Sequence, residues 1–202
     1  TVAYIVVVGT LALGLYTYLG YPALLWLVGR FRPDPLPSSD PTSWPRVSIS
    51  VPMYNEEEQA QGLLDSLLDL DYPRDRLEIV VVSDASTDAT DEIVAGYADR
   101  GVKLLRMPER GGKTRGENAA AAVLTGEIVV NTDASIRLPR DGLKRIVRAF
   151  QDPEIGLASG RDVSVAPGRE VGNLSESGYV GYEMGIRDLE TRVGGIIGAS
   201  GC

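Results

Sequence analysis

The sequence predicts an α/β fold in which a mostly parallel sheet has helices on both faces and one apolar helix precedes it. The 202 residues suffice for one core and an appendage. Residues 1–29 contain no Asp, Glu, Lys or Arg, so every charge lies in the remainder. From residue 46 onward, short apolar runs alternate with segments of helical periodicity, which is typical of βαβ units.

The apolar run at the amino terminus predicts a membrane-spanning helix over residues 1–29. About 20 helical residues cross a bilayer core of about 30 Å, and residues 2–28 are mostly Val, Leu, Ala, Gly and Tyr. Tyr4 near one end, and Tyr21 and Trp26 toward the other, suit the membrane interfaces. A cleaved signal peptide would carry its basic residues before a shorter apolar run. A buried helix of a soluble protein is the other alternative.

The residues after the apolar run predict its orientation and a spacer. Arg30 and Arg32 follow directly, so we expect the next domain to be cytoplasmic and the protein to be integral to the plasma (inner) membrane. Residues 33–45 include five prolines, which predicts a Pro-rich linker over residues 30–45. The folded domain is then expected over residues 46–202.

The two ends of the chain indicate a part of a longer protein. The first residue is Thr1, and residues 194–202 are rich in glycine. We therefore expect the folded domain to be incomplete at its carboxyl end.

Within the domain, the hydrophobic pattern predicts alternating elements. Buried parallel strands show as short continuous apolar runs, whereas helices show an apolar stripe at 3.6-residue spacing. Strands are expected at residues 47–51, 77–82, 102–106, 127–131 and 155–159, and helices at 56–70, 87–98, 116–124, 142–150 and about 173–193.

Composition excludes several kinds of chemistry. The chain has no histidine, which removes Ser-His-Asp and Cys-His catalysis and histidine metal sites. Its one cysteine, Cys202, allows neither an internal disulfide nor a zinc cluster. Any metal must be held by oxygen, which points to Mg²⁺ or Mn²⁺. The net charge of -8 argues against nucleic-acid binding, but it allows a local basic pocket for a phosphorylated small molecule.

Ligands of open parallel sheets bind beyond the carboxyl ends of the strands, so the residues that follow the strands are the candidate site. After the first strand come Tyr54 and Asn55, which suit stacking on a base and hydrogen bonding to it. After the second strand comes Asp84, followed by Ser86 and Thr87, either of which can cap the next helix.

The third and fourth strand ends add a cation and a carboxylate. Gly111 and Gly112 before Lys113 suit a phosphate, although the spacing of a Walker A loop is absent. Alternation puts Asp133 and Ser135 on one side, where both could face a divalent ion that carries a diphosphate. Together the four ends fit a nucleotide diphosphate, whereas a purely structural interpretation makes each an ordinary turn.

These motifs, in this order, resemble the family 2 glycosyltransferases, which have the GT-A fold. The similar stretches are residues 51–57, 82–88, 112–118 and 125–135, and the resemblance runs from about residue 46 to the end. The apolar run, Asp71-Tyr72-Pro73 and the expected helix around residues 182–190 are most similar to the membrane-bound subgroup. That subgroup includes the cellulose, hyaluronan and poly-N-acetylglucosamine synthases.

The resemblance implies an inverting transfer of a sugar from a nucleotide-diphospho-sugar, usually a UDP-sugar, to a saccharide or lipid-linked acceptor. It also implies a role for each matching residue. Pro52, Tyr54, Asn55 and Glu56 would border the base and ribose, Asp84 would contact the nucleotide, Lys113 would lie near the diphosphate, and Asp133 would lead the DxD motif that binds Mg²⁺ or Mn²⁺.

The sequence departs from the family at two places and lacks a third feature. Ser83-Asp84-Ala85-Ser86 stands where Asp-Asp-Gly-Ser is common, and Ser135 replaces the second DxD carboxylate. The general base of the family lies in a Thr-Glu-Asp type motif that would follow Cys202. The chain is therefore expected to hold the donor half of the site and to be inactive by itself, with no residue assigned as proton acceptor.

Two other functions compete with this interpretation. The serine at Ser135 motivates a catalytically degenerate, membrane-tethered scaffold that binds a nucleotide without turnover. A sugar-phosphate nucleotidyltransferase would need a Gly-rich loop near the first strand, where this sequence has Pro52-Met53-Tyr54-Asn55-Glu56.

Overall fold

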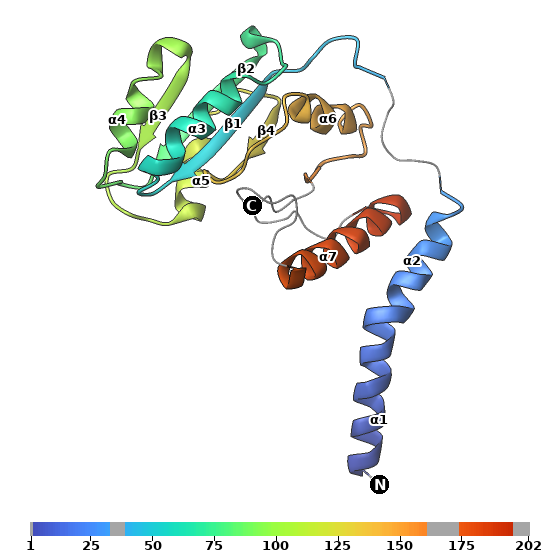
Figure 1. The fold of residues 1–202 in the computed structure, drawn as a ribbon. Helices are drawn as coiled ribbons and strands as arrows, with labels where there is room; N and C mark the ends of the chain where they lie inside the picture. The colour runs from blue at the N-terminus through green and yellow to red at the C-terminus, as the bar shows by residue number, and fades with distance from the viewer. Residues whose placement is uncertain (1, 33–38, 161–173, 196–202) are drawn as a thin grey trace. The chain divides into compact units, whose positions relative to one another are not determined.

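The computed structural model describes residues 2–32, 39–160 and 174–195. These residues form two compact units, which are treated separately below (Figure 1). The first unit contains residues 2–32, 157–160 and 174–195, and the second contains residues 39–156.

The first unit is built on a long apolar helix. It consists of α1 (Val2–Leu15), a π-helical turn (Tyr16–Gly20) and α2 (Tyr21–Gly29). Together they make 28 residues with a mean hydropathy of 1.9, long and apolar enough to cross a membrane by length and composition. The described part of the chain thus has one such helix, over the residues that the apolar run predicts.

A second helix of this unit, α7 (Leu174–Val193), packs along α2. Tyr21 Oη donates to Glu190 Oε1 at 2.7 Å, and Tyr182 Oη donates to the Tyr18 carbonyl oxygen at 3.0 Å. The amphipathic pattern at about 173–193 therefore forms the expected helix, although residue 173 lies outside the described residues.

The second unit is centred on a four-stranded sheet in the order β3-β2-β1-β4. All three strand pairs are parallel, and Met53 of β1 pairs with Ser83 of β2 at their carboxyl ends. The expected parallel sheet is confirmed. Its strands are β1 (Val47–Met53), β2 (Leu77–Ser83), β3 (Val102–Arg106) and β4 (Ile128–Asn131).

Helices cover both faces of the sheet (Figure 1), and the side chains of β2 alternate between two cores. Ile79 and Val81 join a core with α3, α4 and α6, whereas Val80 and Val82 join a smaller core with Met107 and with Ala120 of α5. A strand buried on both faces must be apolar throughout, which explains the run of β-branched residues in β2. The helices are α3 (Glu57–Leu68), α4 (Thr90–Ala95), α5 (Lys113–Ala121) and α6 (Gly142–Ala149), with short 3₁₀ turns at Arg74–Arg76 and Ala98–Arg100.

Three sequence predictions are wrong in detail. The expected strand at residues 155–159 is absent, because Ile155 N donates to the Asp152 carbonyl oxygen in a turn and Gly156 interrupts the apolar run. Helix α4 is shorter than the predicted span of 87–98, and α5 begins at Lys113 rather than at residue 116.

The end of the proline-rich segment contacts the domain. Within residues 39–45, the Trp44 ring packs edge-on against Tyr72 with centroids 5.5 Å apart, and Asp40 forms an ion pair with Arg148. The boundary predicted at residue 46 stays a prediction, but the packed part of the chain begins at residue 39.

A partly buried carboxylate connects the strands near their amino ends. The Glu78 carboxylate of β2 accepts hydrogen bonds from Ser48 Oγ, from Lys103 Nζ at 2.7 Å and from Thr125 N at 2.9 Å. Ser48 Oγ accepts in turn from Gly126 N at 2.8 Å. This network joins β1, β2, β3 and the approach to β4, so it fixes how the strands begin.

The close approach of backbones at Gly126 predicts a sensitive position. A Cβ there would lie 2.4 Å from Ser48 N, so Gly126→Ala forces the backbone apart. We expect a loss of about 2 kcal/mol in the free energy of unfolding. Gly156→Ala is the matched control, because its Cβ would meet nothing within 4 Å. Urea titrations in detergent, followed by circular dichroism, check this, and equal losses in the two variants would contradict it.

Candidate functional site

The carboxyl ends of the strands lie together at one edge of the sheet. The chain runs outward from β1 through β2 to β3, and then returns to the other side of β1 as β4. The strand order therefore reverses between β1 and β4, which is where ligands of open α/β sheets bind. Hydrogen bonds between the loops that follow the strands build the site.

The first contact joins the loops after β1 and β2 through Asn55. Its Oδ1 accepts from Thr87 N at 2.8 Å, and its own backbone N–H donates to Ser86 Oγ at 3.2 Å. Its φ of 54° is in the left-handed region, which Asn tolerates better than most residues. The amide predicted to recognise a base thus holds the neighbouring loop in this structure.

Glu56 and Pro52 occupy supporting places on the first loop. Glu56 precedes α3, and its backbone N–H donates to Thr90 Oγ1 at 2.8 Å. Pro52 lies near the end of β1 and is partly exposed, as is Tyr54. The predicted caps of α4 are wrong, because Asp88 Oδ1 accepts from Thr90 N at 3.0 Å while Ser86 and Thr87 bond to the first loop.

The second contact joins the loop after β2 to the loop before α5 through Asp84. This carboxylate is 7% exposed, and its two oxygens accept from Gly111 N at 2.7 Å and from Gly112 N at 2.8 Å. Gly112 has a φ of 82°, which a residue with a side chain rarely adopts. Asp84 therefore fixes the loop that leads into Lys113.

The third contact joins α5 to the loop after β4. Lys113 Nζ donates to Asp133 Oδ1 at 2.7 Å, and both side chains are partly exposed. Through the intervening glycines, Asp84, Lys113 and Asp133 thus share one edge of the sheet. Sequence reasoning expected this convergence.

The strand alternation expected to align Asp133 with Ser135 does not reach them. Strand β4 ends at Asn131, and the Asp133 carbonyl oxygen accepts from Ile136 N at 3.1 Å in a turn. Ser135 is exposed. The common orientation of these two side chains stays a prediction.

Arg110 is a residue of this edge that sequence reasoning missed. Its guanidinium carbon lies 3.9 Å from the ring centroid of Tyr54, so it covers one face of that aromatic ring. The available signal was a cation directly before Gly111-Gly112, but nothing in the sequence pairs it with a tyrosine 56 positions earlier.

The residues at this edge could hold a metal ion only if a bound diphosphate supplied further ligands. Among the described residues there is no group of three or more Asp, Glu, His or Cys side chains that could hold an ion. Asp133 offers one carboxylate and Ser135 one hydroxyl, both hard oxygen donors. Mg²⁺ commonly takes one or two carboxylates and completes its shell with phosphate oxygens and water. The donor set therefore suits a cation brought in with a diphosphate.

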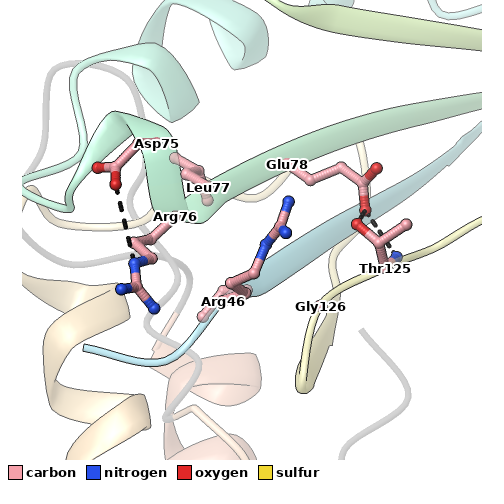
Figure 2. A pocket seen from close by; sticks show the side chains of 8 residues that line it. Arg46, Asp75, Arg76, Leu77, Glu78, Thr125 and Gly126 are labelled. Carbon is pink, nitrogen blue, oxygen red and sulfur yellow. Dashed lines mark hydrogen bonds and ion pairs between the residues drawn. The ribbon is translucent and has the colours of Figure 1, made fainter. Parts of the chain in front are cut away.

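A small hollow lies at the opposite edge of the sheet, where the strands begin. It encloses about 30 Å³ and is lined by Arg46, Glu78, Thr125 and Gly126 among others (Figure 2). That is far below the several hundred Å³ of a typical small-molecule site. The hollow is too small for a nucleotide, so the loops at the carboxyl ends remain the candidate site.

Comparison with known proteins identifies the family. Residues 48–198 match the family described as "Glycosyl transferase family 2". The chain belongs to this family. The match covers the sheet, all four strand ends and α7.

Curated relatives of this glycosyltransferase are similar in sequence but longer. An N-acetylglucosaminyltransferase of Rhizobium sp. (strain N33) is 34% identical over 58% of this chain. A beta-monoglucosyldiacylglycerol synthase of Nostoc sp. (strain PCC 7120 / SAG 25.82 / UTEX 2576) is 30% identical over 91% of it. The chain spans 27% and 40% of these two relatives.

Solved structures of similar proteins contain nucleotide sugars. The mannosyltransferase PcManGT from Pyrobaculum calidifontis, in complex with GDP-Man and Mn²⁺, is 40% identical with a TM-score of 0.61. The aligned region covers 70% of this chain and 43% of that one. S. aureus TarS 1-349 in complex with UDP-GlcNAc is 31% identical with a TM-score of 0.50, over 60% of this chain and 37% of that one. These neighbours confirm the GT-A-like fold.

The network at Glu78 predicts a pH dependence. Burial alone would raise the pKa of this carboxyl group, but hydrogen bonds from Lys103, Ser48 and Thr125 outweigh it and lower the pKa to about 2. A pKa below the unfolded value means that the network stabilises the fold above about pH 4.5. This contribution, roughly 3 kcal/mol, is lost as the pH falls toward 2.

The comparison of wild type with Glu78→Gln isolates this contribution from other carboxylates. We expect the free energy of unfolding of the wild type to fall more steeply between pH 4.5 and 2 than that of the variant. Parallel curves in urea titrations across this range would show that Glu78 is not the group responsible.

A second prediction concerns Ala85, where the family commonly has glycine. Its φ of 56° places a Cβ in the left-handed region, which costs roughly 1 kcal/mol relative to glycine. Ala85→Gly is therefore expected to raise the free energy of unfolding by about 1 kcal/mol. The control Ala121→Gly, in α5, should lower it by about the same amount. Thermal melts measure both, and a loss of stability in Ala85→Gly would refute the assignment of strain.

Proposed function

We propose that this protein transfers a sugar from a nucleotide-diphospho-sugar, most simply a UDP-sugar, to a saccharide or lipid-linked acceptor. The single observation that supports it is the continuous linkage from Asp84 through Gly111 and Gly112 to Lys113 and Asp133. This linkage brings a glycine loop anchored on Asp84, the Lys113 cation and the Asp133 carboxylate together at the edge of the sheet where ligands of open α/β sheets bind. A nucleoside diphosphate needs such a combination of groups.

The donor would lie along this edge with its base at the first loop. Pro52, Tyr54, Asn55 and Glu56 would border the base and ribose, and Asp84 would contact the nucleotide while it holds the glycine loop. Lys113, the first residue of α5, would lie near the diphosphate, where the positive end of the helix adds to its charge. In this role Lys113 would exchange part of its contact with Asp133 for phosphate oxygens.

A divalent cation, Mg²⁺ or Mn²⁺, would be held by Asp133 and Ser135 together with the diphosphate. When bound, the cation would supply Lewis-acid stabilisation to the departing nucleoside diphosphate. The contribution of the protein is to orient the donor and to offset the charge that develops on it. The presence of Mn²⁺ in the complex of PcManGT supports a divalent cation of this kind.

The acceptor, the stereochemistry and the membrane anchor belong to the same proposal. In this proposal, residues 1–29 span the membrane. Residues 30–45 link this helix to the folded domain, and residues 46–202 form the donor-binding part of that domain on the cytoplasmic side. The transfer would invert the anomeric carbon, as in the cellulose, hyaluronan and poly-N-acetylglucosamine synthases. The name of the Nostoc relative, a beta-monoglucosyldiacylglycerol synthase, supports a lipid acceptor. The name of the Rhizobium relative, an N-acetylglucosaminyltransferase, supports transfer of N-acetylglucosamine.

One observation favours a second candidate, a scaffold that binds the donor without turnover. Within the described residues the metal site has one carboxylate, Asp133, and no residue is assigned as general base. The resemblance places that base after Cys202, so the 202-residue chain is expected to bind the donor without transferring the sugar. Both candidates require the same donor-binding edge.

The experiment that tests this edge compares metal-dependent binding in two variants. Asp133→Asn removes the carboxylate proposed to hold the cation. We therefore expect the gain in UDP-sugar affinity caused by Mn²⁺ to be about tenfold smaller, or less still, in this variant than in the wild type. Asp99→Asn is the matched control, because Asp99 lies before β3 at the other edge of the sheet.

Isothermal titration with UDP- and GDP-sugars, with and without Mn²⁺, measures these affinities. Unchanged metal dependence in Asp133→Asn would remove Asp133 from its role. A wild-type chain that binds neither nucleotide sugar would contradict the proposed function itself.

A further inference from the structure

One arginine anchors the turn that follows β4, where the cation is proposed to bind. Arg137 Nη1 donates to the Ala134 carbonyl oxygen at 2.7 Å and to the Ile136 carbonyl oxygen at 3.0 Å. Ala134 and Ile136 stand directly before and after Ser135 in the chain. A single guanidinium group thus holds the backbone on both sides of that serine, immediately after Asp133.

The same guanidinium group also bonds to helix α3. Its Nη2 donates to Gln59 Oε1 at 3.2 Å and to the Gln59 carbonyl oxygen at 3.3 Å. A Cβ at Gly62, three residues further along α3, would lie 3.2 Å from Arg137 Nη2, so glycine leaves the room that the guanidinium occupies. Glycine inside a helix costs roughly 0.5–1 kcal/mol relative to alanine, and the contact with Arg137 supplies a physical reason for it.

Further contacts hold this turn against the sheet and the core. Thr132 N donates to the Ser50 carbonyl oxygen of β1 at 3.1 Å, and Ala134 is buried in the core that α3 and α6 share. The backbone of the turn is therefore fixed by β1, by the core and, through Arg137, by α3. The Asp133 side chain remains partly exposed beside it.

The acceptors of Arg137 are neutral oxygens. Three are backbone carbonyl oxygens and one is an amide oxygen. Within residues 2–32, 39–160 and 174–195, no carboxylate lies within ion-pair distance of this guanidinium, whereas Arg140 nearby pairs with Asp69 at 3.1 Å. A planar guanidinium has five donors in fixed directions, so it can bond to a turn and a helix at once, which a lysine ammonium group does less well.

We propose that Arg137 is a positioning residue for the divalent cation. By holding the turn against α3, it keeps the Asp133 carboxylate and the Ser135 hydroxyl where the cation and the diphosphate bind. This inference rests on the proposed function and adds to it a residue that acts through the backbone of the turn. Groups that orient metal ligands commonly change the metal affinity by about 10- to 100-fold when they are removed.

Two alternative roles give different outcomes. If Arg137 stabilises the fold and nothing more, its loss weakens UDP binding equally with and without the metal. If Arg137 is a second cation for the diphosphate, its loss weakens UDP binding without the metal as well, and lysine replaces it because the charge is retained. A positioning role instead lowers the metal-dependent part of UDP binding and requires the planar guanidinium.

Titrations of the full chain in detergent with UDP, with and without Mn²⁺, separate these roles. Arg137→Ala removes all four hydrogen bonds, and Arg137→Lys keeps the charge without the planar group. Arg140→Ala is the matched control, because Arg140 is an exposed cation of the same loop that bonds to Asp69 instead of the turn. Circular dichroism confirms that each variant is folded.

We expect Arg137→Ala to reduce the gain in UDP affinity caused by Mn²⁺ about tenfold and to leave metal-free UDP binding within about twofold. Arg137→Lys should lose nearly as much of this gain, and Arg140→Ala should change neither affinity beyond about twofold. An equal loss of metal-free binding, or a full Mn²⁺ gain in Arg137→Lys, would overturn the positioning role. A wild-type chain whose UDP binding Mn²⁺ does not strengthen would contradict the proposed function, whereas a wild-type gain that Arg137→Ala leaves intact would contradict this inference alone.

Discussion

The site depends on one buried carboxylate with two adjacent backbone amides. Asp84 is nearly inaccessible, and a buried carboxylate without partners would be costly. Gly111 N donates to one carboxylate oxygen and Gly112 N to the other, so the observed arrangement of the loop satisfies both oxygens. That arrangement starts α5 at Lys113 and brings its ammonium group to Asp133. The position of the Lys113 ammonium group thus follows from the hydrogen bonds that Asp84 accepts at the end of β2.

The sequence predicts the sheet well because burial on both faces leaves a clear pattern. The run from Ile79 to Val82 in β2 is apolar at every position, since alternate residues enter two different cores. The strand at Val102–Arg106 has the bounds that its pattern predicts. Once the strands are located, the rule that ligands bind beyond their carboxyl ends singles out Asp84, Lys113 and Asp133, and these three do share one edge.

The features that the sequence does not predict are those decided by single long-range contacts. At the start of α4, Asp88 accepts a hydrogen bond from Thr90 N, whereas Ser86 and Thr87 bond to the loop after β1. Helical periodicity cannot show this, because the competition for a cap is settled by residues about 30 positions away. The stack of Arg110 on Tyr54 escapes prediction for the same reason, since neither residue has a local pattern that requires the other.

The two edges of the sheet use similar residues for different purposes. At the amino edge, the Glu78 carboxylate accepts from a lysine, a serine and a threonine, and the adjacent hollow of about 30 Å³ is too small for a nucleotide. These groups satisfy one another, so they hold strands together. At the carboxyl edge, the Lys113–Asp133 pair is partly exposed and the Arg110 guanidinium contacts the ring of Tyr54. Charged groups that remain exposed are available to a ligand, and this difference supports the proposal that the donor binds at the carboxyl edge.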